Sequence, residues 1–236
     1  MIRQVVTIAL LALAPVATAA EIIQFRSGQT GGVPGTPGSP DDLVTFNPWG
    51  NPSGAPVLGT PFVAGDFALT AGGAPAVVVQ PQAAWMGGVV DPLTDKDARW
   101  INFESNPFGP SGSALYAVPF WVNTQNITGA TLTFEGGVDE VLGDWYSGGP
   151  NPDGLYIDGI GAGYMYQGFN FAFKTTHAQS IAGMITPGQN YLYFYQRDLT
   201  HGASGIIFSG TIEVVPTSGS ASLLGLVGLL CCRRRR

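Results

Sequence analysis

The central part of this chain lacks cysteine and is poor in histidine. Of 236 residues only two are cysteines, Cys231 and Cys232, and both stand next to the C-terminal arginines. The body therefore has no disulfide bond, and core burial or a bound metal must stabilise it. Only two histidines exist, His177 and His201, and there is no His-Glu-x-x-His and no Gly-x-Ser-x-Gly motif. The sequence thus contains no recognised zinc-protease or serine-hydrolase centre.

Basic residues are also scarce between the two ends. All 16 acidic residues lie in the body, whereas Arg3 and Arg233 to Arg236 account for five of the ten basic residues and belong to the ends. The charge of the body is therefore 5 minus 16, or −11. Because such a surface repels phosphate backbones, nucleic acid is excluded as the expected partner.

Long apolar patterns at helical spacing are missing from the body, and short apolar or alternating segments recur between Gly-rich and Pro-rich turns instead. Many short strands with few charges indicate an all-β fold, an antiparallel β-sandwich. The clean alternation of residues 131–135 is typical of a half-buried strand. The expected strands are Phe62 to Leu69, Ala76 to Val79, Arg99 to Phe103, Ala114 to Val122, Ala130 to Phe134, Leu155 to Ile157, Phe169 to Lys174, Tyr191 to Gln196, Gly205 to Phe208 and Thr211 to Val215.

The N-terminus has the features of a secretory signal peptide. Arg3 precedes the apolar run Val5 to Ala14, and the small-x-small pattern of residues 17–19 follows. We expect a cleavable signal helix over residues 1–20, export through the secretory machinery, and cleavage by signal peptidase near Ala19 or Ala20.

The C-terminus combines a Pro/Ser/Gly hinge, a short apolar run and four arginines. Guanidinium groups resist passage through hydrocarbon, so this arrangement stops translocation and leaves the body outside. A helix from Ser218 to Cys232 would span only about 22 Å, against a hydrocarbon core of roughly 30 Å. We therefore expect a short hydrophobic helix over residues 216–236 that anchors the protein in the membrane only transiently.

This tripartite layout resembles the PEP-CTERM sorting signal of exosortase substrates. The resemblance implies a bacterial protein of the cell envelope or extracellular matrix, processed by an exosortase-like enzyme. Val215-Pro216-Thr217-Ser218 stands where the family has Pro-Glu-Pro. A sortase-type signal and an uncleaved tail anchor remain alternatives. The residues assigned to the signal are Pro216, Thr217, Ser218, Gly219, Arg233, Arg234, Arg235 and Arg236.

Between the ends we expect two regions. Residues 21–60 are punctuated by glycine and proline and are expected to form extended pieces wrapped on the domain. Residues 61–215 are expected to form the β-sandwich domain itself. The order of features from Trp85 to Val215 resembles that of jelly-roll, galactose-binding-like domains, which implies a jelly-roll-like sandwich.

Two aromatic groups are candidate glycan-binding residues. The loop from Leu142 to Asp153 carries Trp145 and Tyr146 together with acidic residues, and flat aromatic faces beside polar groups suit sugar binding. Strand alternation places Tyr191, Tyr193 and Tyr195 on one face. This row is either a glycan platform or a structural surface that packs under a neighbouring segment.

Five acidic residues near this loop raise the question of a structural Ca²⁺, since hard oxygen ligands suit that ion. They are Asp139, Glu140, Asp144, Asp153 and Asp158. Their spacing matches no EF-hand loop, and Asp153-Gly154 and Asp158-Gly159 are good turn dipeptides. Solvated turn residues are the competing interpretation, and no other cofactor is expected.

The sequence thus predicts an exported surface or matrix protein without catalytic activity. One alternative is a carbohydrate-binding module for extracellular polysaccharide, and a second is a glycosidase-like enzyme, which would need two facing carboxylates in a cleft.

Overall fold

The computed structural model describes residues 19–49, 60–108, 112–144, 148–163, 170–199 and 202–217. Within them the fold is all-β, as predicted, and every strand pairing is antiparallel. The elements are β1 (Glu21–Arg26), β2 (Gln29–Thr30), β3 (Val33–Pro34), β4 (Pro40–Trp49), α1 (Ala64–Ala71), β5 (Ala74–Val78), a 3-10 turn (Met86–Gly88), β6 (Ile101–Asn102), β7 (Ser113–Val122), β8 (Ile127–Val138), β9 (Val141–Leu142), β10 (Leu155–Ile157), β11 (Ile160–Gly161), β12 (Thr175–Ser180), β13 (Gly188–Arg197) and β14 (Ile206–Pro216).

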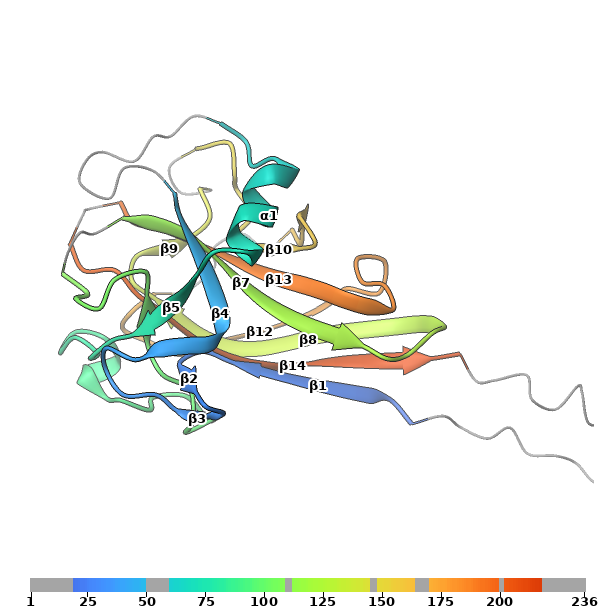
Figure 1. Ribbon diagram of the computed structural model, residues 1–236, viewed down its shortest axis with the longest axis horizontal. Coiled ribbons are helices and arrows are strands. Elements are labelled where there is room, and N and C mark those ends of the chain that lie inside the picture. Colours follow the sequence, from blue (N-terminus) through green and yellow to red (C-terminus); the bar gives the residue numbers. More distant parts are fainter. Residues whose placement is uncertain are drawn as a thin grey trace, which may run out of the picture.

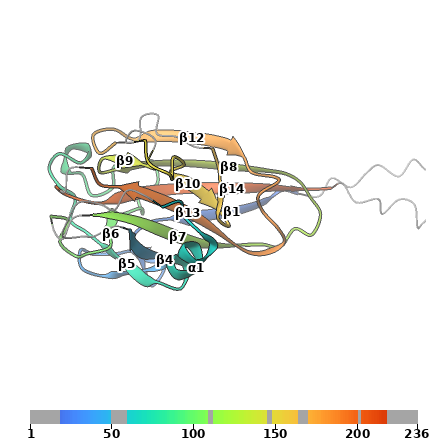
Figure 2. The same cartoon turned by 90° about the horizontal axis from the view of Figure 1, so that it is seen from above.

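The main sheet curls so that its two halves face each other (Figures 1 and 2). The front layer has the strand order β11-β10-β13-β7-β4-β5, and β9 also pairs with β13. The back layer continues as β6-β14-β8-β12, and β1 pairs with β14 on the side away from β8. The short strand β6 joins the layers, since it pairs with both β5 and β14. The arrangement is therefore sandwich-like.

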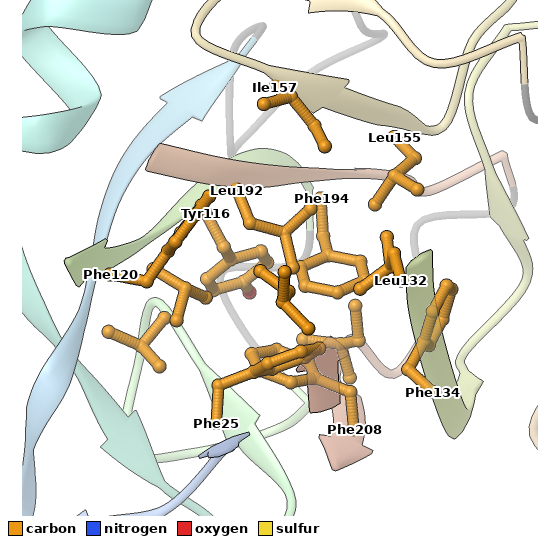
Figure 3. Packing of buried hydrophobic residues seen from close by; sticks show 14 of the residues in the cluster. Phe25, Tyr116, Phe120, Leu132, Phe134, Leu155, Ile157, Leu192, Phe194 and Phe208 are labelled. Atoms are coloured by element: carbon orange, nitrogen blue, oxygen red, sulfur yellow. The ribbon is translucent and has the colours of Figure 1, made fainter. Parts of the chain in front are cut away.

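The core between the layers is made of the inward-facing residues of both (Figure 3). Phe194 on β13 stacks on Phe208 of β14 with a centroid distance of 4.3 Å, and Phe134 on β8 meets Phe194 edge-on at 5.4 Å. Phe25 on β1 adds a further ring against Phe208. Aromatic pairs of this kind stabilise a core beyond the area they bury.

The first expected strand, Phe62 to Leu69, is wrong, because α1 occupies most of it. The Asp66 carboxylate accepts a hydrogen bond from the Val63 N–H at 2.8 Å, which caps the helix at its start. Alanine and leucine favour a helix, and one face buries Phe67 against the outer side of the front layer. Residues 62–69 are rich in apolar side chains, but these side chains do not alternate with polar ones as they do in a half-buried strand.

The other expected strands agree unevenly with the structure. Residues 205–208 and 211–215 belong to one continuous strand, β14. The expected strand Phe169 to Lys174 is absent: residues 171–174 form no strand and β12 begins at Thr175, while Phe169 lies outside the described residues. Asp158 and Gly159 both have positive φ and make the tight turn of the β10–β11 hairpin, as their dipeptide suggests.

Residues 21–49, which were expected to form extended pieces wrapped on the domain, do contain extended strands, but β1 and β4 belong to the main sheet itself. There β4 pairs with both β5 and β7. The prolines of β4, Pro40 and Pro48, stand near its two ends, so the residues between them keep their backbone donors. Proline punctuation therefore marked the ends of this strand.

Gly210 allows the core aromatics to approach β14 closely. It lies opposite both Phe25 and Phe134, and a Cβ atom there would overlap the Thr133 carbonyl oxygen and lie 2.7 Å from Cζ of Phe25. We expect Gly210→Ala to lower the free energy of unfolding by about 1–3 kcal/mol, as overpacking does. Urea unfolding measures the change.

Gly129→Ala is the matched control, because its Cβ would lie 3.6 Å from the nearest atom, Cβ of Val215. It is expected to leave stability unchanged or slightly raised, since alanine loses less backbone entropy in a strand. Equal destabilisation by both variants would contradict the packing at Gly210.

Candidate functional site

An open groove of about 460 Å³ lies on the outer face of the back layer. Along β14 the side chains alternate, so Phe208 and Ile212 point into the core while Ser209 and Thr211 point outward. The same alternation on β1 and β8 turns Gln24 and Thr133 to this face. The further lining residues are Arg26, Thr94, Asp95, Phe134, Glu135, Thr176 and Gly210.

A loop closes one end of this groove. Residues 79–100 fold over the start of β14, where Trp85 and Trp100 stack at 4.5 Å and cover Ile207. Beyond Ile207 the outer face carries the groove. The groove therefore has a wall, formed by Thr94 and Asp95, and a floor formed by strands.

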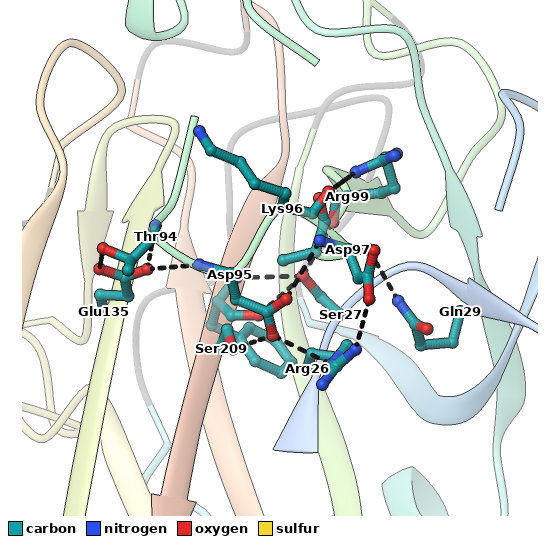
Figure 4. Close-up of polar contacts among 12 residues, drawn as sticks. Arg26, Ser27, Gln29, Thr94, Asp95, Lys96, Asp97, Arg99, Glu135 and Ser209 are labelled. Atoms are coloured by element: carbon teal, nitrogen blue, oxygen red, sulfur yellow. Dashed lines mark hydrogen bonds and ion pairs between the residues drawn. The ribbon is translucent and has the colours of Figure 1, made fainter. Parts of the chain in front are cut away.

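Ion pairs fix the wall to the floor (Figure 4). Asp95 bonds the Nε atom of Arg26 at 3.0 Å and accepts a hydrogen bond from the Ser209 hydroxyl at 2.6 Å. Glu135 accepts hydrogen bonds from the Thr94 hydroxyl at 2.9 Å and from the Asp95 N–H at 3.2 Å. The floor and the wall are thus bound together by charged groups from both.

Lys174 completes this network, since its Nζ atom lies 2.8 Å from Oε2 of Glu135 and donates to the Thr94 hydroxyl at 2.7 Å. Burial opposes the charge on Glu135, but the hydrogen bonds from Lys174, Thr94 and Asp95 outweigh burial and lower its pKa. The carboxylates of Asp95 and Glu135 are therefore engaged by protein groups. The exposed hydroxyl and amide groups of Gln24, Thr133 and Thr176 are the groups that the groove presents to solvent.

A second cavity, of about 420 Å³, is lined by Asp139 and Glu140, the two residues that follow β8. Its walls include Trp85, Phe108 and Phe171. Burial raises the pKa of Asp139 to about 7; a side-chain hydrogen bond from Trp85 opposes this shift, and the neighbouring Glu140 and Asp198 add to it.

The five candidate Ca²⁺ ligands are placed in different surroundings. Asp139 and Glu140 line the second cavity, whereas Asp144 is buried in an ion pair with Arg197, with Oδ1 to Nε at 3.0 Å. Asp153 packs beside Gly161, and Asp158 accepts the Tyr191 N–H at 2.7 Å. The described residues contain no group of three or more His, Cys, Asp or Glu side chains that could hold a metal ion.

The tyrosine row is brought together but only partly exposed. Tyr193 and Tyr195 are buried in a cluster with Phe62 and Phe67, and Phe67 lies 4.9 Å from the Tyr193 ring. Burial raises the pKa of both tyrosines well above the usual range. Tyr191 is the half-buried member at the edge of this cluster. Phe67 of α1, a helix that sequence reasoning missed, covers Tyr193, and Phe62 just before the helix packs edge-on against Tyr195 at 4.8 Å.

Several predicted residues fall outside the described part of the chain: Trp145, Tyr146, Ser218, Gly219, Arg233, Arg234, Arg235 and Arg236. Pro216 is the last residue of β14, and the Thr217 N–H donates to the Asn126 carbonyl at 2.8 Å. Both predicted terminal helices, residues 1–20 and 216–236, lie almost wholly outside the described residues. No described helix is long and apolar enough to cross a membrane.

Sequence reasoning missed the groove and an exposed aromatic, Trp121. The groove unites β1, β8, β12 and β14, which no sequence spacing relates. The exposure of Trp121 could have been predicted from the expected strand Ala114 to Val122. Strand alternation places Trp121 on the face opposite to that of Phe120 and Val122, which enter the core.

The chain matches no protein-family model, and no curated protein is significantly similar to it. The candidate sites therefore rest on their own geometry.

Asp139 generates a pH prediction. The pKa of Asp139 is about 7 in the folded protein, against 3.8 for an unperturbed carboxyl group. At a pH between these two values, Asp139 keeps its proton in the folded protein and loses it in the unfolded chain. Stability contributed by the protonated form is therefore present at low pH and lost as pH rises from about 4 to about 7. We expect Asp139→Asn to remove this part of the decline, as measured by urea unfolding at pH 4.5 and 7.5.

Asparagine keeps an oxygen that can accept the hydrogen bond from Trp85. Asp91→Asn, at a half-buried loop position outside this cavity, is the control and should keep the wild-type pH dependence. An unchanged slope in Asp139→Asn would show that this carboxyl is ionised in the folded protein at neutral pH.

Proposed function

We propose that this is an exported bacterial protein of the cell envelope or extracellular matrix that binds polysaccharide in the groove of its back layer. Its body is a jelly-roll-like, non-catalytic module. The signal peptide takes it across the membrane, and the C-terminal signal hands it to an exosortase-like enzyme.

The observation that carries the binding proposal is the lining of the groove. Hydroxyl and amide side chains from several strands converge on one open, elongated face, and such groups exchange hydrogen bonds with sugar hydroxyls at little cost. Arg26 and Lys174 are already paired with Asp95 and Glu135, so no unpaired charge selects a charged polymer. A neutral polysaccharide is the ligand class that fits.

The same ion pairs favour binding over catalysis. Glycoside cleavage needs one carboxylic acid that holds its proton and one free carboxylate, placed across the scissile bond. Glu135 has a lowered pKa, and both it and Asp95 already accept several hydrogen bonds from protein groups. Neither is positioned to donate a proton to a leaving group.

The placement of the chain ends supports attachment at one pole. Glu21 pairs with Val214, so the points where both terminal segments join the domain are adjacent (Figure 1). The Glu21 carboxylate also accepts hydrogen bonds from Asn123 and Thr124 in the β7–β8 turn. The groove lies on a side face, which an attachment at this pole leaves accessible.

The double variant Thr133→Val and Thr211→Val tests the groove. It removes two hydroxyl groups and keeps the side-chain shape, so retention on neutral polysaccharides is expected to weaken by about tenfold, as the loss of two hydrogen bonds predicts. Affinity electrophoresis through gels containing glucan, xylan or chitin derivatives measures it.

Thr186→Val, at an exposed position just before β13 on the other layer, is the matched control. Retention of the wild type on none of the polymers, or equal retention of the wild type and the double variant, would contradict groove binding.

The sorting proposal predicts a truncated mature C-terminus. Mass spectrometry of protein purified from envelope and medium fractions is expected to show a chain that lacks Arg233 to Arg236 and starts near Glu21. An intact Arg236 in both fractions would contradict processing.

A further inference from the structure

Trp121 is an exposed aromatic on the outer face of the front layer. It lies on β7, where Phe120 and Val122 point into the core and Trp121 points away from it, with 58% of its surface exposed. Exposing so large an apolar ring in water is unfavourable by itself. Its surroundings therefore decide what it can bind.

Polar groups surround this ring. Gln189 on β13 is the register partner of Trp121, and its amide donates to the Tyr191 hydroxyl at 2.8 Å. Tyr191 is in turn opposite Pro119, the outward neighbour of Trp121 on β7. Trp121, Gln189 and Tyr191 therefore form one patch across two paired strands, which we call the tryptophan patch.

The patch is the uncovered end of the tyrosine row. The Tyr191 ring stacks on that of Tyr193 at 6.0 Å with an interplanar angle of 29°, and Tyr193 lies beneath Phe67 of α1. The Tyr191 N–H is held by Asp158. The Tyr193 ring and the Asp158 carboxylate thus restrain Tyr191, so one side of the tryptophan patch is held in place.

We propose that the tryptophan patch is a saccharide-binding surface, in which the face of a pyranose ring stacks on Trp121 and its hydroxyls bond to Gln189 and Tyr191. An aromatic face binds the C–H side of a sugar, and adjacent amide and phenol groups satisfy its hydroxyls. A lipid surface would also accept an exposed tryptophan. The acidic body and the nearby Asp158 and Glu21 disfavour an anionic bilayer, so a sugar is the better match.

The patch and the groove lie on the outer faces of opposite layers. A protein that holds sugar on both faces joins two polysaccharide chains. This consequence rests on the proposed groove function, whereas sugar binding by the patch does not.

Trp121→Ala tests the patch, with Trp121→Phe and Tyr191→Ala as graded variants. Isothermal titration calorimetry with cellohexaose, laminarihexaose, xylohexaose and chitohexaose measures the affinity of the wild type and of each variant without relying on tryptophan fluorescence. Affinity in Trp121→Ala should fall about tenfold or more, and Trp121→Phe should keep part of it. Circular dichroism and urea unfolding check that each variant is folded.

Leu69→Ala is the control, because Leu69 is a similarly exposed apolar residue on α1 and does not belong to the patch. Equal affinity of Trp121→Ala and wild type for every oligosaccharide, or no binding by the wild type, would overturn the proposal. A further result would also overturn the proposal: Trp121→Ala loses binding to vesicles of phosphatidylcholine and phosphatidylglycerol but binds the oligosaccharides as tightly as the wild type does.

Turbidity of mixtures with a long polysaccharide separates the two sites. The wild type is expected to cross-link the polymer, while Trp121→Ala and the groove double variant each remain bound and fail to cross-link. If Trp121→Ala loses oligosaccharide binding while the groove double variant binds like the wild type, sugar binding by the patch is supported and sugar binding by the groove is contradicted. The reverse pattern contradicts the patch and supports the groove.

Discussion

The stack of Phe194 on Phe208 is the contact on which the rest of this structure depends. The body has no cysteine, and the covalent links between its two layers run only through the backbone. The layers are held together by apolar side chains, and these two rings, at 4.3 Å, join the long strands β13 and β14. Because both strands bury one face in the core, only the uncovered parts of their other faces can bind a ligand.

The alternation of β14 produces three environments from one strand. Phe208 and Ile212 enter the core, Ile207 is covered by the loop of residues 79–100, and Ser209 and Thr211 line the groove. A slip of one residue against β8 would exchange the core and groove residues, so the register of β8 and β14 fixes the fold and the site together. Gly210 contributes by letting Phe25 and Phe134 approach the strand from inside.

Sequence reasoning predicted the class of fold and several long strands, because a period of two is local information. It did not predict α1, whose residues 64–71 carry no long helical pattern and are stabilised by a cap and by Phe67 packing on tyrosines far away in sequence. It found Tyr191, Tyr193 and Tyr195 as one row, yet could not tell which of them the segment that contains Phe62 and α1 would cover. It could not predict the groove, since Arg26, Asp95 and Glu135 meet only after β1, β14 and β8 have paired and the loop that carries Asp95 has folded over them.

Rigidity connects these features to the proposed role outside the cell. A binding face that must hold a polymer is more effective when its groups are already fixed, because less side-chain entropy is lost on binding. Here ion pairs fix the wall of the groove, and the β13 pairing with its stacked tyrosines fixes the tryptophan patch. The faces point in opposite directions and the chain ends share one pole. In the proposed function the body stays attached at that pole while each face holds a separate polysaccharide chain, and the placement of the two faces and the chain ends is the geometry that such cross-linking requires.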